Sequence, residues 1–370
     1  MTESAIEKHF TRERTIPART PQNYHPAYPV YTARWSKSAT DLVMAVLGMQ
    51  FASKDDRTPE SRVKLFSFLE SKGTDGATRP SFFEVASVTD ASGYYNEAII
   101  AYWPSNSAYK NWAAESGFQA WWDGLDPERG SHGWFMEVFF PTMDRIETAY
   151  TNNEIAEGAA HLKDSISGAI TEHGYWGSMR DRLPTSQTDP LEGDRADWSV
   201  RTGENPTSTM KRRIRVPGTS NLAVIRSGQD WADTSPVERE LYLNEMHPVL
   251  VKGMDFLRDS GREVGCYSCR LMDIVDAETA KADRDRTFGL AYFDELASLE
   301  RWSKEHPTHL AIFGGFFRYA KKLENQITLR LSHEVLVLQP EQQLFEYVGC
   351  HAATGMLTAI YGHPRTVKIV

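Results

Sequence analysis

Apolar residues along the chain recur with two periods, the alternation of a β-strand and the three-to-four residue spacing of a helix. In the first half these periods predict strand, helix, strand, strand, helix and strand, in that order. The predicted ranges are Leu42 to Ala52, Ser61 to Lys72, Phe82 to Thr89, Glu97 to Trp103, Ser105 to Gly124 and Gly133 to Pro141. This order is that of a ferredoxin-like fold.

The second half predicts the same order, with its last helical stretch broken at Pro307. The predicted ranges are Asn221 to Ser227, Val237 to Ser260, Gly265 to Val275, Thr287 to Phe293, Glu295 to Leu323 and Ile327 to Leu338. Short motifs repeat as well. Ala101 to Trp103 followed by Trp112 matches Ala291 to Phe293 followed by Trp302, at one constant offset. We therefore predict an α+β protein of two ferredoxin-like repeats, of the dimeric α/β-barrel type.

The repeat divides the chain into parts of different composition. Residues 1–40 are rich in Pro, Arg and Tyr without periodicity, which predicts an extended N-terminal arm. The two repeats occupy residues 41–150 and 220–350, and a C-terminal tail occupies residues 351–370. Residues 151–219 connect the repeats.

The connecting segment contains two stretches of different character. His173 to Arg182 mixes aromatic residues with glycine, which is typical of a packed functional segment. The polar run from Pro184 to Thr207 and the basic cluster from Lys211 to Arg215 are expected to be solvated surface.

Composition narrows the class of protein. The length of 370 residues suits two domains, and 41% hydrophobic with 25% charged residues is ordinary for a soluble protein. A net charge of -9 disfavours nucleic acid as a partner. No apolar stretch approaches the roughly 20 residues that a membrane span needs, and the N-terminus lacks a secretory signal. Three cysteines suit a reducing cytoplasm, and ten Trp suit a thick core or a pocket for a flat apolar group.

Cys266 and Cys269 form a CxxC motif within a predicted strand. Residues three apart on a strand point to opposite faces, and no second CxxC follows to complete a zinc site. We therefore expect two ordinary thiols, with Cys350 standing alone.

Two histidines, His306 and His309, lie at the start of the helix predicted near Pro307. His306 and His309 have the spacing of a zinc pair, but no third ligand is near. His309 shares a helix face with an aromatic stripe, and Gly314 and Gly315 remove bulk beside it. The stripe consists of Phe313, Phe316 and Phe317. Two interpretations stay open: a proximal haem ligand, or a helix-end histidine packed in the core.

Four more residues have alternative interpretations. His333 alternates with Leu331 and Val335 on the apolar face of a strand, where it is either a buried core residue or a desolvated acid or base. Ser227 ends a strand without a nucleophile motif, which favours a hydrogen-bonding role. Glu147 and Arg182 by themselves resemble ordinary surface charges.

Longer runs of the sequence resemble the haem-containing aldoxime dehydratases, the family that includes phenylacetaldoxime dehydratase. The resemblance rests on His173 to Arg182, Ile225 to Ala232, Gly253 to Asp259, Leu299 to Leu310 and His333 to Val335, and it extends from Glu3 to Gly355. It implies a homodimeric enzyme with haem b, ferrous in its active form, which the cysteine count places in the cytoplasm. Such an enzyme dehydrates a small hydrophobic aldoxime, R–CH=N–OH, to a nitrile.

The resemblance also implies roles for individual residues. His309 is the implied proximal iron ligand, in preference to His306, and His333 the distal catalytic histidine. Ser227 is implied to bind the oxime hydroxyl beside Arg182, with Glu147 and His173 as further polar groups on the distal side. The aromatic stripe of Phe313, Phe316 and Phe317 is expected to wall the haem.

These roles predict a reaction path, and other functions remain as alternatives to it. His333 as imidazolium protonates the departing oxygen and then takes the proton from carbon, and Glu147 favours its charged form if it lies close. The alternatives are a haem peroxidase, a chlorite-dismutase-like enzyme, a non-catalytic haem-binding protein, or a protein without cofactor. A distal set of His, Ser and Arg favours the dehydratase.

Overall fold

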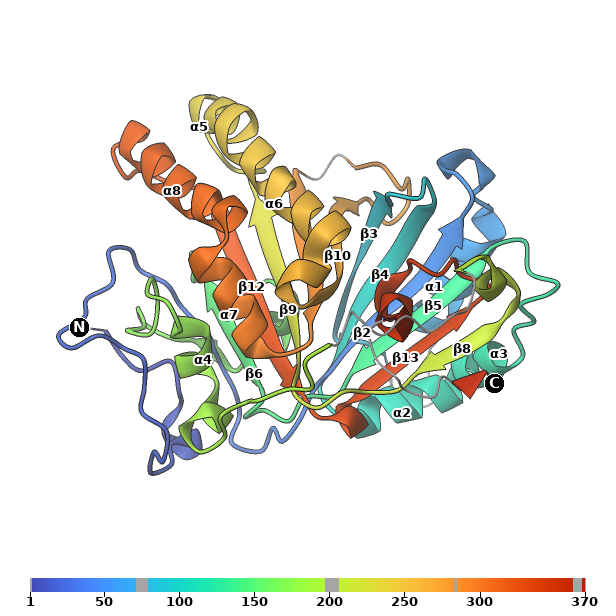
Figure 1. Ribbon diagram of the computed structural model, residues 1–370, viewed down its shortest axis with the longest axis horizontal. Helices are drawn as coiled ribbons and strands as arrows, with labels where there is room; N and C mark the ends of the chain where they lie inside the picture. The colour runs from blue at the N-terminus through green and yellow to red at the C-terminus, as the bar shows by residue number, and fades with distance from the viewer. Residues whose placement is uncertain (1, 71–78, 197–205, 283–284, 362–367, 370) are drawn as a thin grey trace.

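The computed structural model describes residues 2–70, 79–196, 206–282, 285–361 and 368–369. Its centre is one large, curled, mainly antiparallel sheet of 12 strands (Figure 1). The strands lie in the order β14-β8-β13-β5-β2-β4-β3-β10-β11-β9-β12-β6. A second sheet pairs β1 (Ala33–Arg34) with β7 (Ser165–Ile166). None of the described helices is long and apolar enough to cross a bilayer.

The first half contains the elements that the pattern predicts, with one correction. They are β2 (Val43–Phe51), α1 (Pro59–Glu70), β3 (Phe82–Thr89), β4 (Tyr95–Trp103), α2 (Asn106–Glu115), α3 (Phe118–Asp123) and β5 (Gly133–Phe139). The single helix predicted from Ser105 to Gly124 is wrong. It breaks at Gly117, whose φ of 78° lies in the left-handed region that ends helices. The predicted end of the first helix, residues 71–72, lies outside the described residues.

The second half also follows the predicted order. It contains β9 (Leu222–Asp230), α5 (Pro236–Leu241), α6 (His247–Ser260), β10 (Cys266–Val275), β11 (Arg286–Phe293), α7 (Leu296–Glu305), α8 (Pro307–Lys322) and β12 (Arg330–Leu338). The predicted break at Pro307 is confirmed. A π-helical turn (Tyr242–Met246) separates α5 from α6, and the last strand starts at Arg330 rather than Ile327.

Several short strands were not predicted. They are β6 (Ile146–Tyr150), β8 (Arg213–Val216), β13 (Gln343–Val348) and β14 (Lys368–Ile369). The expectation of a solvated connecting segment is wrong at two places. Pro184–Gln187 forms a buried turn after α4 (Ser178–Arg182), and Arg213 of the basic cluster lies inside, where it contacts Glu346.

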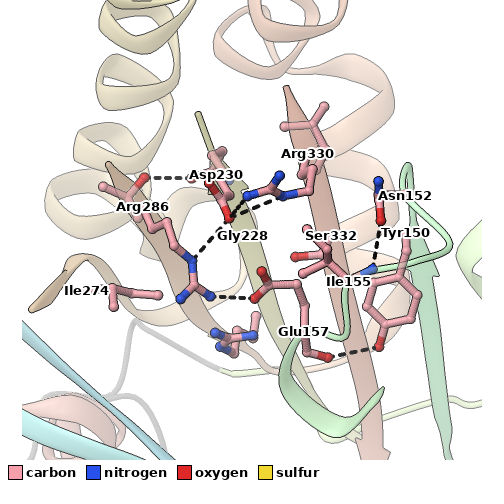
Figure 2. Close-up of a pocket in the computed structure, with 14 residues that line it drawn as sticks. Tyr150, Asn152, Ile155, Glu157, Gly228, Asp230, Ile274, Arg286, Arg330 and Ser332 are labelled. Atoms are coloured by element: carbon pink, nitrogen blue, oxygen red, sulfur yellow. Dashed lines mark hydrogen bonds and ion pairs between the residues drawn. The ribbon is translucent and has the colours of Figure 1, made fainter. Parts of the chain in front are cut away.

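The two halves join where β3 pairs with β10 over Asp273–Val275. Behind this junction Arg226 contacts Glu84 of the first half and lies 3.6 Å from Glu334 of β12. Figure 2 shows the adjoining charges, where Arg286 contacts Glu157 and Asp230 across a pocket of only about 10 Å³. The charges are therefore mutually satisfied, and we assign this small pocket to the joint between the halves.

Helices cover each half of the sheet, but the space beneath them differs. Under α2 and α3 the first half is filled by stacked aromatic rings, among them Trp103, Trp112 and Phe118. Helices α5 to α8 lie over β9 to β12 (Figure 1), and beneath them a large cavity remains. Trp112 and Trp302 are both buried, as expected, but Trp302 also lines that cavity.

Candidate active site

A cavity of about 650 Å³ lies between the sheet and the helices of the second half. Its floor is formed by β9, β11 and β12, and its walls by α6, α7, α8 and the 173–179 segment. Most of its lining is apolar, including Ile225, Leu250, Leu257, Phe293 and Trp302. A cavity of this size and composition suits a flat apolar ligand.

His309 enters the cavity from the first turns of α8. Its ring lies edge-on to Trp302, with ring centres 4.8 Å apart. The Nδ1 atom is buried, and no described group makes a hydrogen bond of standard geometry to it. Burial lowers the pKa of His309 to about 4, although the Ser303 backbone opposes this shift. The imidazole is therefore neutral, which is the form that binds a metal.

His306 has a different place. It caps the N-terminus of α8 by accepting a hydrogen bond from the Thr308 backbone, and its ring stacks on Phe256 at 3.9 Å. Among the described residues, no three His, Cys, Asp or Glu side chains gather as a metal site. Of the two histidines, His309 is therefore the one that faces the cavity with a free side.

The polar side chains face the cavity from the sheet. His333 of β12 lies directly opposite Ser227 of β9 and, on its other side, opposite Ala149 of β6. The register therefore places His333 beside Ser227 on one face, because directly opposed residues have Cβ atoms about 4.5–5.5 Å apart. Both side chains line the cavity, as does His173.

An ion pair is buried directly behind His333. Arg182 of α4 donates to both carboxylate oxygens of Glu147 on β6, at 2.6 and 2.9 Å. Its Nη2 also lies 2.8 Å from His333 Nε2, whereas Glu147 is 3.7 Å from that atom. Since an arginine can only donate, His333 Nε2 accepts and its proton is on Nδ1.

The charges around His333 reverse one expectation. Burial, the Arg182 guanidinium and His173 all lower the pKa of His333 well below its ordinary value. Glu147 does not favour the imidazolium as expected, because its charge is directed at Arg182. About 30% of the His333 side chain is accessible, on the side that lines the cavity. The resting residue is a neutral imidazole with an open side.

The N-terminal arm holds the 173–179 segment in place. Tyr24 donates a hydrogen bond to the His173 backbone carbonyl at 2.6 Å, and the Arg19 backbone N–H donates to Asp181 at 3.0 Å. Gly177 has a φ of 101°, and a Cβ there would lie 2.5 Å from Arg19. Burial and Arg182 lower the pKa of His173 to about 4, so it is neutral too.

The aromatic stripe of α8 only partly faces the cavity. Phe313 lines it, with its ring 5.1 Å from that of Trp176. Phe316 and Phe317 lie outside the lining and pack against Tyr28 of the arm. The structure thus brings one of the three expected rings to the cavity, because α8 turns the other two toward the arm.

The aromatic lining comes largely from residues that sequence reasoning did not select. Trp176 was noticed only as part of a glycine-rich run, and Trp302 only as a core residue. Met254 of α6 appears only within the run from Gly253 to Asp259, without a role of its own. Each is an ordinary apolar residue of its helix or loop, so no local signal marks it.

The cysteines are ordinary thiols, but for a different reason than expected. A β-bulge between Cys266 and Ser268 shifts the register, so Cys266 and Cys269 belong to the same apolar cluster rather than to opposite faces. Both thiols are buried and free, and burial raises the pKa of Cys269 to about 12.

Comparison with known proteins gives consistent matches. The family described as Haem-containing dehydratase matches residues 45–356. An aliphatic aldoxime dehydratase from Rhodococcus erythropolis is 39% identical, covering 96% of this chain and 97% of that protein. A phenylacetaldoxime dehydratase from Bacillus sp. (strain OxB-1) is 31% identical, covering 91% and 93%. The crystal structure of an aldoxime dehydratase in complex with butyraldoxime has a TM-score of 0.86, 39% identity and 96% coverage of both chains.

Proposed function

The chain belongs to the haem-containing dehydratase family, and on that premise we propose that it converts aldoximes, R–CH=N–OH, to nitriles and water. The observation that carries the proposal is that one cavity has a candidate metal ligand on one side and a set of polar side chains on the other. His309 enters from the helices, and His333, Ser227 and the Arg182–Glu147 pair lie at the sheet.

The cavity fits a haem on three counts. Its lining is largely apolar, its size suits a flat ligand, and His309 is a neutral imidazole without a standard side-chain partner among the described residues. His309 is the residue that would hold the haem iron, and Phe313 and Trp302 line the same cavity. A haem bound here, which we propose is ferrous haem b, would supply electron density that weakens the N–O bond of the oxime.

Ser227 and Arg182 orient the substrate at its hydroxyl end. The Ser227 hydroxyl lines the cavity next to His333, so it can hydrogen-bond the oxime oxygen there. The Arg182 guanidinium is fixed by both oxygens of Glu147 and lies behind the cavity lining, so it would stabilise negative charge on the departing oxygen through His333, whose Nε2 it reaches at 2.8 Å. Fixing the leaving group next to a proton carrier lowers the entropy cost of the reaction.

His333 moves the proton. With Nε2 accepting from Arg182 and the proton on Nδ1, the neutral ring supports an order in which Nδ1–H first gives its proton to the departing oxygen and Nδ1 then takes the proton from the oxime carbon. Carbon loses one proton and oxygen gains one, so water leaves and the histidine returns to its starting form. Glu147 is a positioning residue in this scheme, because it acts through Arg182, and His173 adds a neutral polar group.

Two structural proposals accompany the function. In the sheet, the first half has the order β5-β2-β4-β3 and the second half the order β10-β11-β9-β12. In each half the two central strands are the first and third of that half in chain order. This shared order supports two ferredoxin-like repeats that meet at the β3–β10 joint. We also propose a cytoplasmic homodimer, with which the exposed side chains of the extended N-terminal arm (residues 1–40, described from residue 2) are consistent.

The deciding experiment is optical. The purified protein should show a Soret band, and anaerobic reduction followed by an aldoxime should give nitrile without net consumption of reductant. A protein that reduced peroxide but left aldoximes unchanged would contradict the proposal in favour of a peroxidase.

A further inference from the structure

A second cavity, of about 410 Å³, lies beside the proposed haem cavity. It opens where β10 diverges from β3, since the two strands pair only over Asp273–Val275. Its walls come from α6, the N-terminal part of β10, the turn before β4 and the 355–358 segment. Neither the reaction scheme nor the joint between the halves uses this space.

One side chain separates the two cavities. Among the described residues, Met254 of α6 alone lines both of them. On the far side its sulfur lies 3.8 Å from the Cys269 thiol, which burial keeps neutral by raising its pKa to about 12. Next to Met254 the second cavity has the neutral Cys269 thiol and Leu271, and the rest of its lining is mixed, with Asp255 and Arg258 among its charged groups.

On the near side Met254 lies next to the reacting groups. Its sulfur is 2.8 Å from the position that a Cβ of Gly289 would occupy, so it fills the space above that glycine. Gly289 is directly opposite Ser227 in the register of β11 and β9. Opposed positions share a face about 4.5–5.5 Å apart, so the thioether lies beside the Ser227 side chain.

We propose that Met254 determines substrate length by closing the cavity beside Ser227 against the second cavity, which would otherwise receive the far end of a long aliphatic aldoxime. The proposal rests on the proposed dehydratase function. An unbranched chain that passed this position would contact Cys269 and Leu271, and a polar terminus would reach Arg258. Methionine is a flexible filler of irregular gaps, which suits a residue that seals one cavity from another.

The test compares four holoenzymes: wild type, Met254→Ala, Met254→Leu and Leu250→Ala. Leu250 is also on α6 and lines the haem cavity, but it does not line the second cavity, so its truncation adds space without opening the wall. Met254→Leu keeps the wall with a side chain of similar volume. For each, kcat/KM is measured with butyraldoxime and with dodecanal oxime.

We expect the ratio of the long to the short substrate to rise at least tenfold in Met254→Ala, because each accommodated methylene changes kcat/KM by about 10–200-fold in an apolar pocket. The ratio should stay within about threefold of wild type in Met254→Leu and Leu250→Ala. An unchanged ratio in Met254→Ala, or an equal gain in Leu250→Ala, would overturn the assignment.

A binding measurement separates this proposal from the proposed function. Linear alkylamines are titrated into the ferric holoprotein and followed by the visible spectrum, because amines bind haem iron whatever reaction the enzyme catalyses. Tighter binding of dodecylamine relative to butylamine, specific to Met254→Ala, supports the wall even if no aldoxime is turned over. Equal relative affinities in all four proteins would overturn it.

Discussion

At the scale of single residues, the position of protons around His333 is decided by one neighbour. Arg182 donates to Nε2, so the remaining proton lies on Nδ1 and a second proton is disfavoured. The carboxylate that could have balanced this effect, Glu147, is 3.7 Å away and bound to the same arginine. The Arg182–Glu147 pair therefore donates a hydrogen bond to His333 and does not accept its proton.

The pH dependence follows from that arrangement. The folded pKa of His333 lies below its ordinary value of about 6.5, so the active neutral form persists as pH falls through that value. We expect kcat/KM to stay flat from neutrality to below pH ~6.5 and to fall only as the lowered pKa is crossed. A steady-state pH profile checks this, and an acid limb centred above pH ~6.5 would contradict it.

Replacement of His333 tests its role directly. His333→Ala should retain the haem and its Soret band but lose about 10²–10⁴ in turnover, the usual contribution of a proton carrier. The measurement is single-turnover nitrile formation under anaerobic reduction. Turnover near that of wild type would remove His333 from the proton path.

His309 of α8 and the N-cap residue His306 allow a matched pair of substitutions. His309→Ala should purify without haem, because it removes the proposed axial ligand, whereas His306→Ala should keep the haem and lose only a helix cap worth about 0.5–2 kcal/mol. Haem content per chain from the Soret and protein absorbances gives the comparison. Full haem content in His309→Ala would refute the ligand assignment.

At the scale of elements, local patterns predicted the strands that carry the site but not the side chains that complete it. The alternation of Leu331, His333 and Val335 was enough to place His333 on an apolar face, and Pro307 was enough to place the break before α8. Arg182 approaches His333 across 151 positions of sequence, and such proximity has no local signature.

Short elements were missed for a related reason. β8 and β13 pair with each other, and β13 also pairs with β5, which is distant in sequence. Four to six residues in extended form carry little periodicity, so pairing partners decide their structure. The π-helical turn between α5 and α6 is likewise invisible in the helical pattern.

Strand β2 offers a test of packing between strands. Gly48 lies directly opposite Phe135 of β5, and a Cβ at position 48 would lie 2.0 Å from the phenyl ring. The ring is fully buried, so moving it would disturb its packed neighbours. Gly48→Ala should therefore lower the free energy of unfolding by about 1–3 kcal/mol.

Denaturant unfolding of the apoprotein measures that effect, and a double variant controls it. Phe135→Leu relieves the contact, so Gly48→Ala should cost less in the Phe135→Leu background than in wild type. Equal costs in the two backgrounds would show that the ring is not the obstacle.

At the scale of the whole molecule, buried charges tie the halves together behind the catalytic strands. Arg226 precedes Ser227 in the sequence, and Glu334 follows His333. Because side chains alternate along a strand, Arg226 and Glu334 point to the face of the sheet opposite the site. There Arg226 contacts Glu84 of the first half, and Tyr102 donates to Glu334 at 3.1 Å. The position of the site thus depends on the contact between halves.

This contact predicts a large effect of one substitution. Glu84→Leu leaves Arg226, 2% exposed, with the more distant carboxylate of Glu334 and the ring of Phe288 as its described partners. We expect a loss of about 3 kcal/mol in unfolding free energy, the lower part of the range for a broken buried pair. Glu245→Leu is the surface control, because Glu245 pairs with Lys322 in solvent and such pairs contribute about 0–1 kcal/mol. Equal losses in the two variants would contradict the argument.

The placement of β13 has a consequence for the order of synthesis. This strand, Gln343–Val348, pairs with β5 of the first half, yet it leaves the ribosome after every residue of the site. Until then the edge of β5 has no partner on that side, although β2 to β5 can already fold. A nascent chain paused anywhere between the two strands therefore exposes an open sheet edge, the kind of surface on which chains aggregate. We therefore expect slower completion of translation to lower the yield of soluble protein.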